Sequence, residues 1–116
     1  MRTPSDALVG PVAVQTMSDL HVDALLLGVH GMDPEAGLTT PNLMEADMNR
    51  AMIAATSRLI VLADHTKWRV VGLCAMARLA DVSVLVSDEG LGTEARDALS
   101  SLVGELVVAN PGEKTA

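Results

Sequence analysis

The chain has 116 residues, 49% apolar and 20% charged, a balance that excludes an intrinsically disordered chain and suits one domain or part of one. Its net charge of −7, without any cluster of Lys and Arg, argues against unaided binding to DNA phosphates. The single aromatic residue argues against binding of single-stranded nucleic acid by base stacking. The lone cysteine excludes an internal disulfide.

The first residues contain no apolar signal segment, and no apolar run approaches the roughly 18 residues of a membrane span. We therefore expect a cytoplasmic protein that makes no membrane contact.

Four apolar runs predict β-strands, and each follows a segment that predicts a helix. In the second helix the apolar side chains recur at Met44, Met48 and Met52, which predicts a buried methionine face. Thr93 is the predicted cap of the fourth helix, and Cys74 is predicted to lie buried within the third. In chain order the predicted elements are helix 11–20, strand 24–29, helix 44–55, strand 58–63, helix 71–79, strand 82–87, helix 94–103 and strand 105–109.

This alternation predicts an α/β fold: a three-layer, Rossmann-like open parallel sheet with helices on both faces. We place the domain at residues 9–109, with a lead-in at 1–8 and a flexible tail at 110–116. Ligands of such sheets bind outside the carboxyl ends of the strands. In this chain those ends are residues 28–40, 64–69 and 88–92.

Gly28 and Gly31 follow the first strand. Their pattern has two interpretations: a tight turn without a ligand, or backbone that closely approaches an anion. The spacing is neither that of a dinucleotide-binding fingerprint nor that of a P-loop. Glu45 also has two interpretations, because it lies three residues after Asn42. It either caps the helix in a capping box or accepts hydrogen bonds from sugar hydroxyls.

Asp64 and Lys67 lie three residues apart after the second strand. Such a pair can bind a polyol phosphate, with the carboxylate on hydroxyls and the ammonium on phosphate, or it can be a surface turn with a weak ion pair. His30 and His65 lie at the same edge, but no histidine pairs with another ligand at metal-binding spacing. We therefore predict neither a metal site nor a cofactor. For Asp88, which follows the third strand, turn capping is favoured over ligand contact.

Together, these stretches resemble the C-terminal effector-sensing domain of DeoR/GlpR-type bacterial transcription regulators. The resemblance covers residues 8–109. It rests on DALLLGVHGMD at 23–33, GLT at 37–39, EADMNRAM at 45–52, LADHTKW at 62–68 and VLVSD at 84–88.

The resemblance implies the fold of ribose-5-phosphate isomerase and glucosamine-6-phosphate deaminase, and a non-catalytic domain that senses a phosphorylated sugar or related metabolite. It also implies a regulator, expected to be a repressor, that assembles into homo-oligomers. DNA would be bound only through an N-terminal helix-turn-helix domain, which this chain lacks together with the first part of the sensor. The expected effector-binding residues are Gly28, Gly31, Thr39, Glu45, Asp64 and Lys67, which match family positions, together with His30 at the same edge.

Two alternatives stay open. One is a sugar-phosphate isomerase or deaminase, for which Glu45 and Asp64 are the only candidate bases. The other is a module that only oligomerises and binds no ligand.

Overall fold

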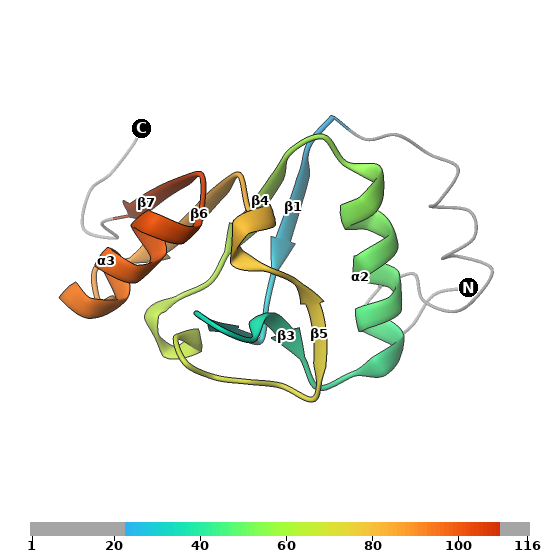
Figure 1. The fold of residues 1–116 in the computed structure, drawn as a ribbon, viewed down its shortest axis with the longest axis horizontal. Helices are drawn as coiled ribbons and strands as arrows, with labels where there is room; N and C mark the ends of the chain where they lie inside the picture. Colours follow the sequence, from blue (N-terminus) through green and yellow to red (C-terminus); the bar gives the residue numbers. More distant parts are fainter. Residues whose placement is uncertain (1–22, 110–116) are drawn as a thin grey trace.

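The computed structural model describes residues 23–109. Its main sheet is parallel, with the strands in the spatial order β1, β4, β6, β7 (Figure 1). All four predicted strands are confirmed, each to within two residues at either end. Their bounds are β1 Leu25–Gly28, β4 Leu59–Leu62, β6 Val84–Asp88 and β7 Glu105–Ala109. The predicted helix 11–20, the lead-in 1–8 and the tail 110–116 lie outside the described residues.

A second, antiparallel sheet was not predicted. It consists of β2 (Gly31–Asp33), β3 (Gly37–Thr40) and β5 (Cys74–Ala77), with β3 in the centre. The predicted helix 71–79 is therefore wrong, because β5 occupies its middle and pairs with β3. Alanine and methionine favour a helix locally, but pairing with a distant strand overrides that preference.

The turn between β2 and β3 is stabilised by Asp33, whose carboxylate accepts hydrogen bonds from the backbone N–H groups of Glu35 and Ala36, both at 2.9 Å. These bonds hold the pKa of Asp33 below its usual value, because they favour the ionised carboxylate. Gly37 ends the turn with φ at +78°, a conformation in which a side chain would be strained.

Helix α2 (Leu43–Ala55) begins as predicted, since the Asn42 side chain accepts a hydrogen bond from the backbone N–H of Glu45 at 2.9 Å. The predicted methionine face is only partly present. Met48 is buried, whereas Met44 is 44% exposed.

The second described helix, α3 (Thr93–Leu102), lies at the opposite end of the molecule from α2 (Figure 1). Its N-cap is Gly92, and no side chain caps it, so the predicted Thr93 cap is wrong. Cys74, expected to be buried, is partly exposed in β5.

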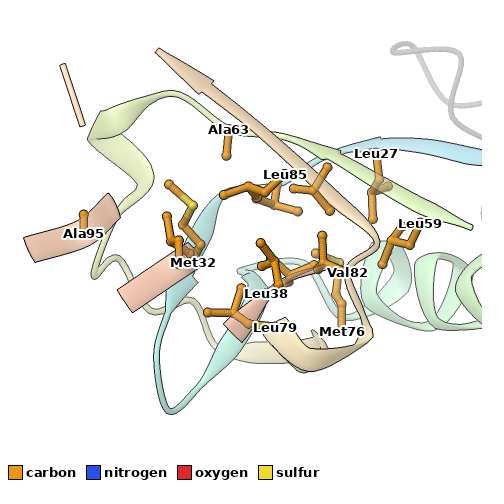
Figure 2. Packing of buried hydrophobic residues seen from close by; sticks show 14 of the residues in the cluster. Leu27, Met32, Leu38, Leu59, Ala63, Met76, Leu79, Val82, Leu85 and Ala95 are labelled. Atoms are coloured by element: carbon orange, nitrogen blue, oxygen red, sulfur yellow. The ribbon is translucent and has the colours of Figure 1, made fainter. Parts of the chain in front are cut away.

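The hydrophobic core lies between the two sheets (Figure 2). One face of the parallel sheet is buried in it, whereas Leu26, Leu62 and Val107 on the other face are exposed within the described part of the chain. Both sheets therefore share a single core. Its contributors include Leu27, Val61 and Leu85 from the parallel sheet, Met32, Leu38 and Met76 from the antiparallel sheet, and Ala95 and Leu99 from α3.

Ser87 in β6 is buried, and its hydroxyl has no hydrogen-bond partner among residues 23–109. An unsatisfied buried hydroxyl costs about 1–3 kcal/mol, so we expect Ser87→Ala to raise the free energy of unfolding by about 1 kcal/mol in a urea titration. The matched control is Ser83→Ala, which removes the acceptor of the Leu59 backbone N–H at 3.2 Å and should lower stability instead. A loss in both variants would show that the Ser87 hydroxyl has a partner.

Candidate functional site

The candidate site lies at the carboxyl edge of the parallel sheet, where neighbouring strands end together. Gly28 of β1 pairs with Leu62 of β4, and Leu62 pairs with Val86 of β6. The segments that follow these strands therefore leave the sheet at one edge. This is the edge at which open parallel sheets bind their ligands.

The turn after β4 carries Asp64 and Lys67. Asp64 caps a single 3₁₀ turn, η1 (His65–Lys67), by accepting hydrogen bonds from the backbone N–H of Thr66, at 2.8 Å, and from its hydroxyl. These bonds, with a smaller contribution from the charge of Lys67, hold the pKa of Asp64 below its usual value. Asp64 is therefore an ionised, exposed carboxylate. The Lys67 side chain forms no ion pair with any described residue.

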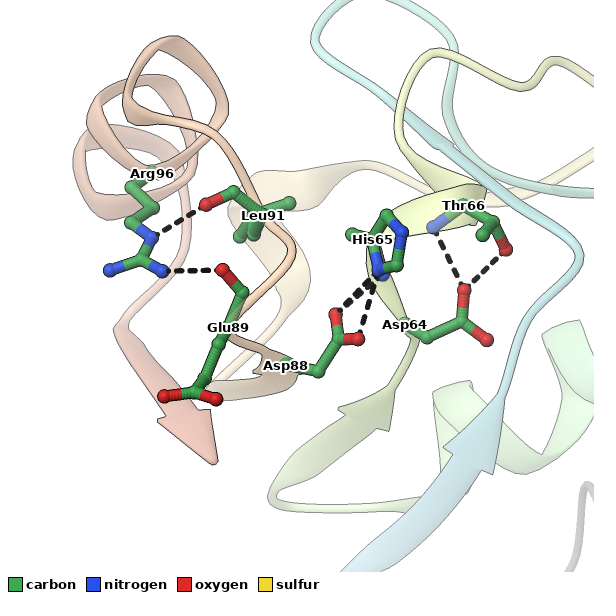
Figure 3. Close-up of polar contacts among 7 residues, drawn as sticks. All are labelled: Asp64, His65, Thr66, Asp88, Glu89, Leu91 and Arg96. Atoms are coloured by element: carbon green, nitrogen blue, oxygen red, sulfur yellow. Dashed lines mark hydrogen bonds and ion pairs between the residues drawn. The ribbon is translucent and has the colours of Figure 1, made fainter. Parts of the chain in front are cut away.

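His65 links this turn to the end of β6. The carboxylate of Asp88 accepts a hydrogen bond from the His65 backbone N–H at 2.8 Å and lies 2.9 and 3.1 Å from Nδ1 of its ring (Figure 3). The side-chain bond from His65 is the main reason that the pKa of Asp88 is lowered. The sequence predicted that Asp88 caps its own turn. In the structure its carboxylate bonds to His65 instead.

The turn that follows Asp88 is held by α3. Arg96 donates from Nε to the carbonyl oxygen of Leu91 at 2.7 Å and from a terminal nitrogen to that of Glu89 at 3.0 Å (Figure 3). The Asp88 carboxylate is therefore presented by a turn that is fixed to the first part of the helix.

A second contact joins the β4 turn to α3. The guanidinium of Arg69 pairs with Glu94 at 3.0 Å and lies over the ring of Trp68, 5.4 Å from its centroid. This ion pair lowers the pKa of Glu94. Arg69 has φ at +63°, an uncommon conformation for a residue with a side chain.

His30 and Glu45 meet at the end of β1. Their side chains are 4.0 Å apart, from Nε2 to Oε1, and both are about half exposed. The capping-box interpretation of Glu45 is confirmed only in part. Its backbone N–H bonds to Asn42, but the Asn42 N–H bonds at 3.4 Å to the hydroxyl of Thr40 rather than to Glu45.

Gly31 and Thr39 form a register pair in the antiparallel sheet, and both support the segment 70–72. The Thr39 hydroxyl is buried and accepts a hydrogen bond from the Gly72 N–H at 2.8 Å. A Cβ on Gly31 would lie 2.0 Å from the carbonyl oxygen of Val70. The space that Gly31 leaves is therefore filled by the chain's own backbone.

The structure thus brings the predicted residues into three small groups. His30 approaches Glu45, Gly31 pairs with Thr39, and Asp64 shares a turn with Lys67. Gly28 lies beside the last of these through its pairing with Leu62. The pairs His65–Asp88 and Arg69–Glu94 were not predicted, because their members are far apart in the sequence and nothing local marks them.

Residues 23–109 contain no group of three His, Cys, Asp or Glu side chains arranged to hold a metal ion. In the same part of the chain, no helix is both long enough and apolar enough to cross a membrane.

Comparisons with a family model and with individual known proteins point to the same family. Residues 1–89 match the family described as the DeoR C terminal sensor domain. The transcriptional repressor AccR of Agrobacterium fabrum is 39% identical over 102 residues, which cover 87% of this chain and 40% of that protein. The HTH-type transcriptional regulator GlpR of Haloferax volcanii is 33% identical over 101 residues, again 87% of this chain and 40% of that protein.

A third relative, the putative aga operon transcriptional repressor of Escherichia coli O157:H7, is 30% identical over 108 residues and 93% of this chain. The chain spans about 40% of the length of these three relatives, all of which are transcription regulators rather than enzymes. The predicted resemblance is confirmed: the chain belongs to the DeoR family of transcription regulators and corresponds to their C-terminal sensor domain.

Proposed function

We propose that this chain is the effector-binding module of a transcriptional repressor, and that its effector is a phosphorylated sugar or a related metabolite. The observation that carries the proposal is the β4 turn. It places an ionised carboxylate, Asp64, and an ammonium group without an ion-pair partner among the described residues, Lys67, on one exposed turn. A carboxylate accepts hydrogen bonds from sugar hydroxyls, and an ammonium group binds phosphate.

His30 and Glu45 supply further polar groups at the neighbouring strand end, and Gly28 leaves backbone open there. Gly31 and Thr39 would contribute by holding the segment 70–72 in place. We further propose that the parallel sheet is part of a three-layer open sheet like that of the sugar-phosphate isomerases. DNA binding would belong to a separate helix-turn-helix domain of an oligomeric regulator.

The mechanism proposed is linkage. A ligand that binds one conformation or assembly more tightly shifts the population toward it, and an attached DNA-binding domain then changes its affinity. Asp64, one of the two candidate bases, is poorly suited to general-base catalysis. A general base works best with a pKa near the working pH, whereas the bonds from Thr66 lower the pKa of Asp64.

The test is thermal unfolding of the 116-residue chain with D-ribose 5-phosphate, D-glucosamine 6-phosphate or D-glucose 6-phosphate. A ligand that binds only the folded state at 100 times its Kd adds about 2.7 kcal/mol of stability. We expect at least one of the three to raise Tm and none to be turned over. Product formation would support the enzyme instead, and an unchanged Tm with all three would contradict the proposal.

A further inference from the structure

The imidazole ring of His65 packs against the turn after β6, where Asp88 and Gly90 surround it. The Asp88 carboxylate accepts a hydrogen bond from the His65 backbone N–H at 2.8 Å and lies 2.9 Å from Nδ1 of the His65 ring. Gly90 leaves room for the ring, because a Cβ at this position would lie 2.4 Å from Nδ1 and 2.7 Å from two ring carbons. Two separate features, a carboxylate and a missing side chain, therefore fix one ring.

The partner of Nδ1 determines what the rest of the ring can do. An ionised carboxylate only accepts hydrogen bonds, so the hydrogen of a neutral imidazole lies on Nδ1. The ionised state of Asp88 is favoured by its lowered pKa, which the bond from His65 causes. In that tautomer Nε2 carries a lone pair and can accept a hydrogen bond.

The ring belongs to the turn that carries the proposed site. His65 lies between Asp64 and Thr66 on the same turn as Lys67, and its side chain is 46% exposed. Figure 3 shows the ring between the Asp88 carboxylate and the turn held by Asp64. No residue among 23–109 donates a hydrogen bond to Nε2, and the side chain is partly exposed.

We infer that His65 is a further ligand-binding residue, whose Nε2 accepts a hydrogen bond from a ligand hydroxyl, with Asp88 as its positioning residue. The inference rests on the proposed function. It describes the ligand as a phosphate ester that also carries hydroxyl groups, because a lone pair on Nε2 needs a donor such as a hydroxyl. Lys67 binds the phosphate, and His65 and Asp64 bind hydroxyls.

Two substitutions separate ligand contact from structural support. In His65→Asn the amide nitrogen replaces Nδ1 and can still donate to Asp88, but no atom replaces Nε2. In His65→Gln the longer side chain carries its amide to about the place of Nε2. The experiment is calorimetric titration of the 116-residue chain with whichever of the three sugar phosphates raises Tm most.

We expect His65→Asn to weaken binding about tenfold, the effect of one lost hydrogen bond, and His65→Gln to recover part of the loss. Tm without ligand should change little in His65→Asn. In the nuclear magnetic resonance spectrum of the wild-type chain, the ligand should move the ¹⁵N resonance of Nε2 more than that of Nδ1. Inorganic phosphate should leave Nε2 unchanged.

Three results would overturn the inference. Wild-type affinity in His65→Asn, with binding lost in a Lys67 variant, would make His65 a structural link only and leave the proposed function standing. A shift of Nε2 by inorganic phosphate alone would make the ring a phosphate contact. Absence of binding of all three sugar phosphates to the wild-type chain would remove both proposals.

Discussion

Replacing Lys67 by methionine is expected to abolish the thermal stabilisation of the chain by sugar phosphates. Methionine keeps the length and apolar part of the side chain but removes the ammonium group. A hydrogen bond to a charged group contributes about 1.5–3 kcal/mol, so affinity should fall by about 10- to 150-fold. Calorimetric titration of both chains with the same sugar phosphate measures the change directly.

The control for this experiment is Arg78→Met, which removes the same charge from an exposed side chain that pairs with Asp81. It should leave the affinity within about twofold, since a distant surface charge is screened by salt. Equal losses in the two variants would show that net charge, rather than a contact at Lys67, governs binding. Retention of full affinity in Lys67→Met would remove Lys67 from the site.

Gly31→Ala is expected to destabilise the fold by about 3 kcal/mol, the upper part of the usual range for an added methyl group in a packed region. The new Cβ would lie 2.0 Å from the Val70 carbonyl oxygen and 2.8 Å from the Thr39 hydroxyl. The first of these is backbone and cannot rotate away, so β2 and the segment 70–72 would have to separate. The free energy of unfolding in urea measures the loss.

Gly28→Ala provides the matched comparison, because the nearest atom to its Cβ would be the Leu62 carbonyl oxygen at 4.0 Å. Its stability should change by less than about 1 kcal/mol, because the added methyl group has room and alanine also restricts the unfolded chain. If the two variants are equally unstable, the contact with Val70 is not what requires glycine at position 31.

The strands of the parallel sheet were predictable because each reads as a short continuous apolar run. Residues 59–62 (LIVL) and 84–86 (VLV) are short apolar runs rich in branched side chains, which favour strands. The Asn42 cap was predictable for a similar reason, since it depends on residues three apart. Local patterns therefore predicted the elements whose physical cause is local.

The antiparallel sheet was not predictable in this way. β2 is three residues long, and β5 (CAMA) is made of residues that favour helices or have no strong preference. Both are strands because of partners in β3. Their turn residues, Asp33 and Gly37, do mark a hairpin, and that signal was available in the sequence.

The candidate site shows the same division. Asp64 and Lys67 were identified from their spacing, because one turn holds both. The pairing of His65 with Asp88 depends on the adjacency of β4 and β6, which spacing alone does not reveal. The hydrogen bond that Thr39 accepts from Gly72 was not predictable for the same reason, because Gly72 lies in a distant segment of the sequence.

The antiparallel sheet has a consequence for exchanging parts between relatives. Its hairpin and its third strand come from distant stretches of sequence, with α2 and β4 between them. A chimera with a junction anywhere from residue 41 to 73 would join β3 of one parent to β5 of the other. Functional hybrids of these regulators should therefore keep residues 31–77 from a single parent.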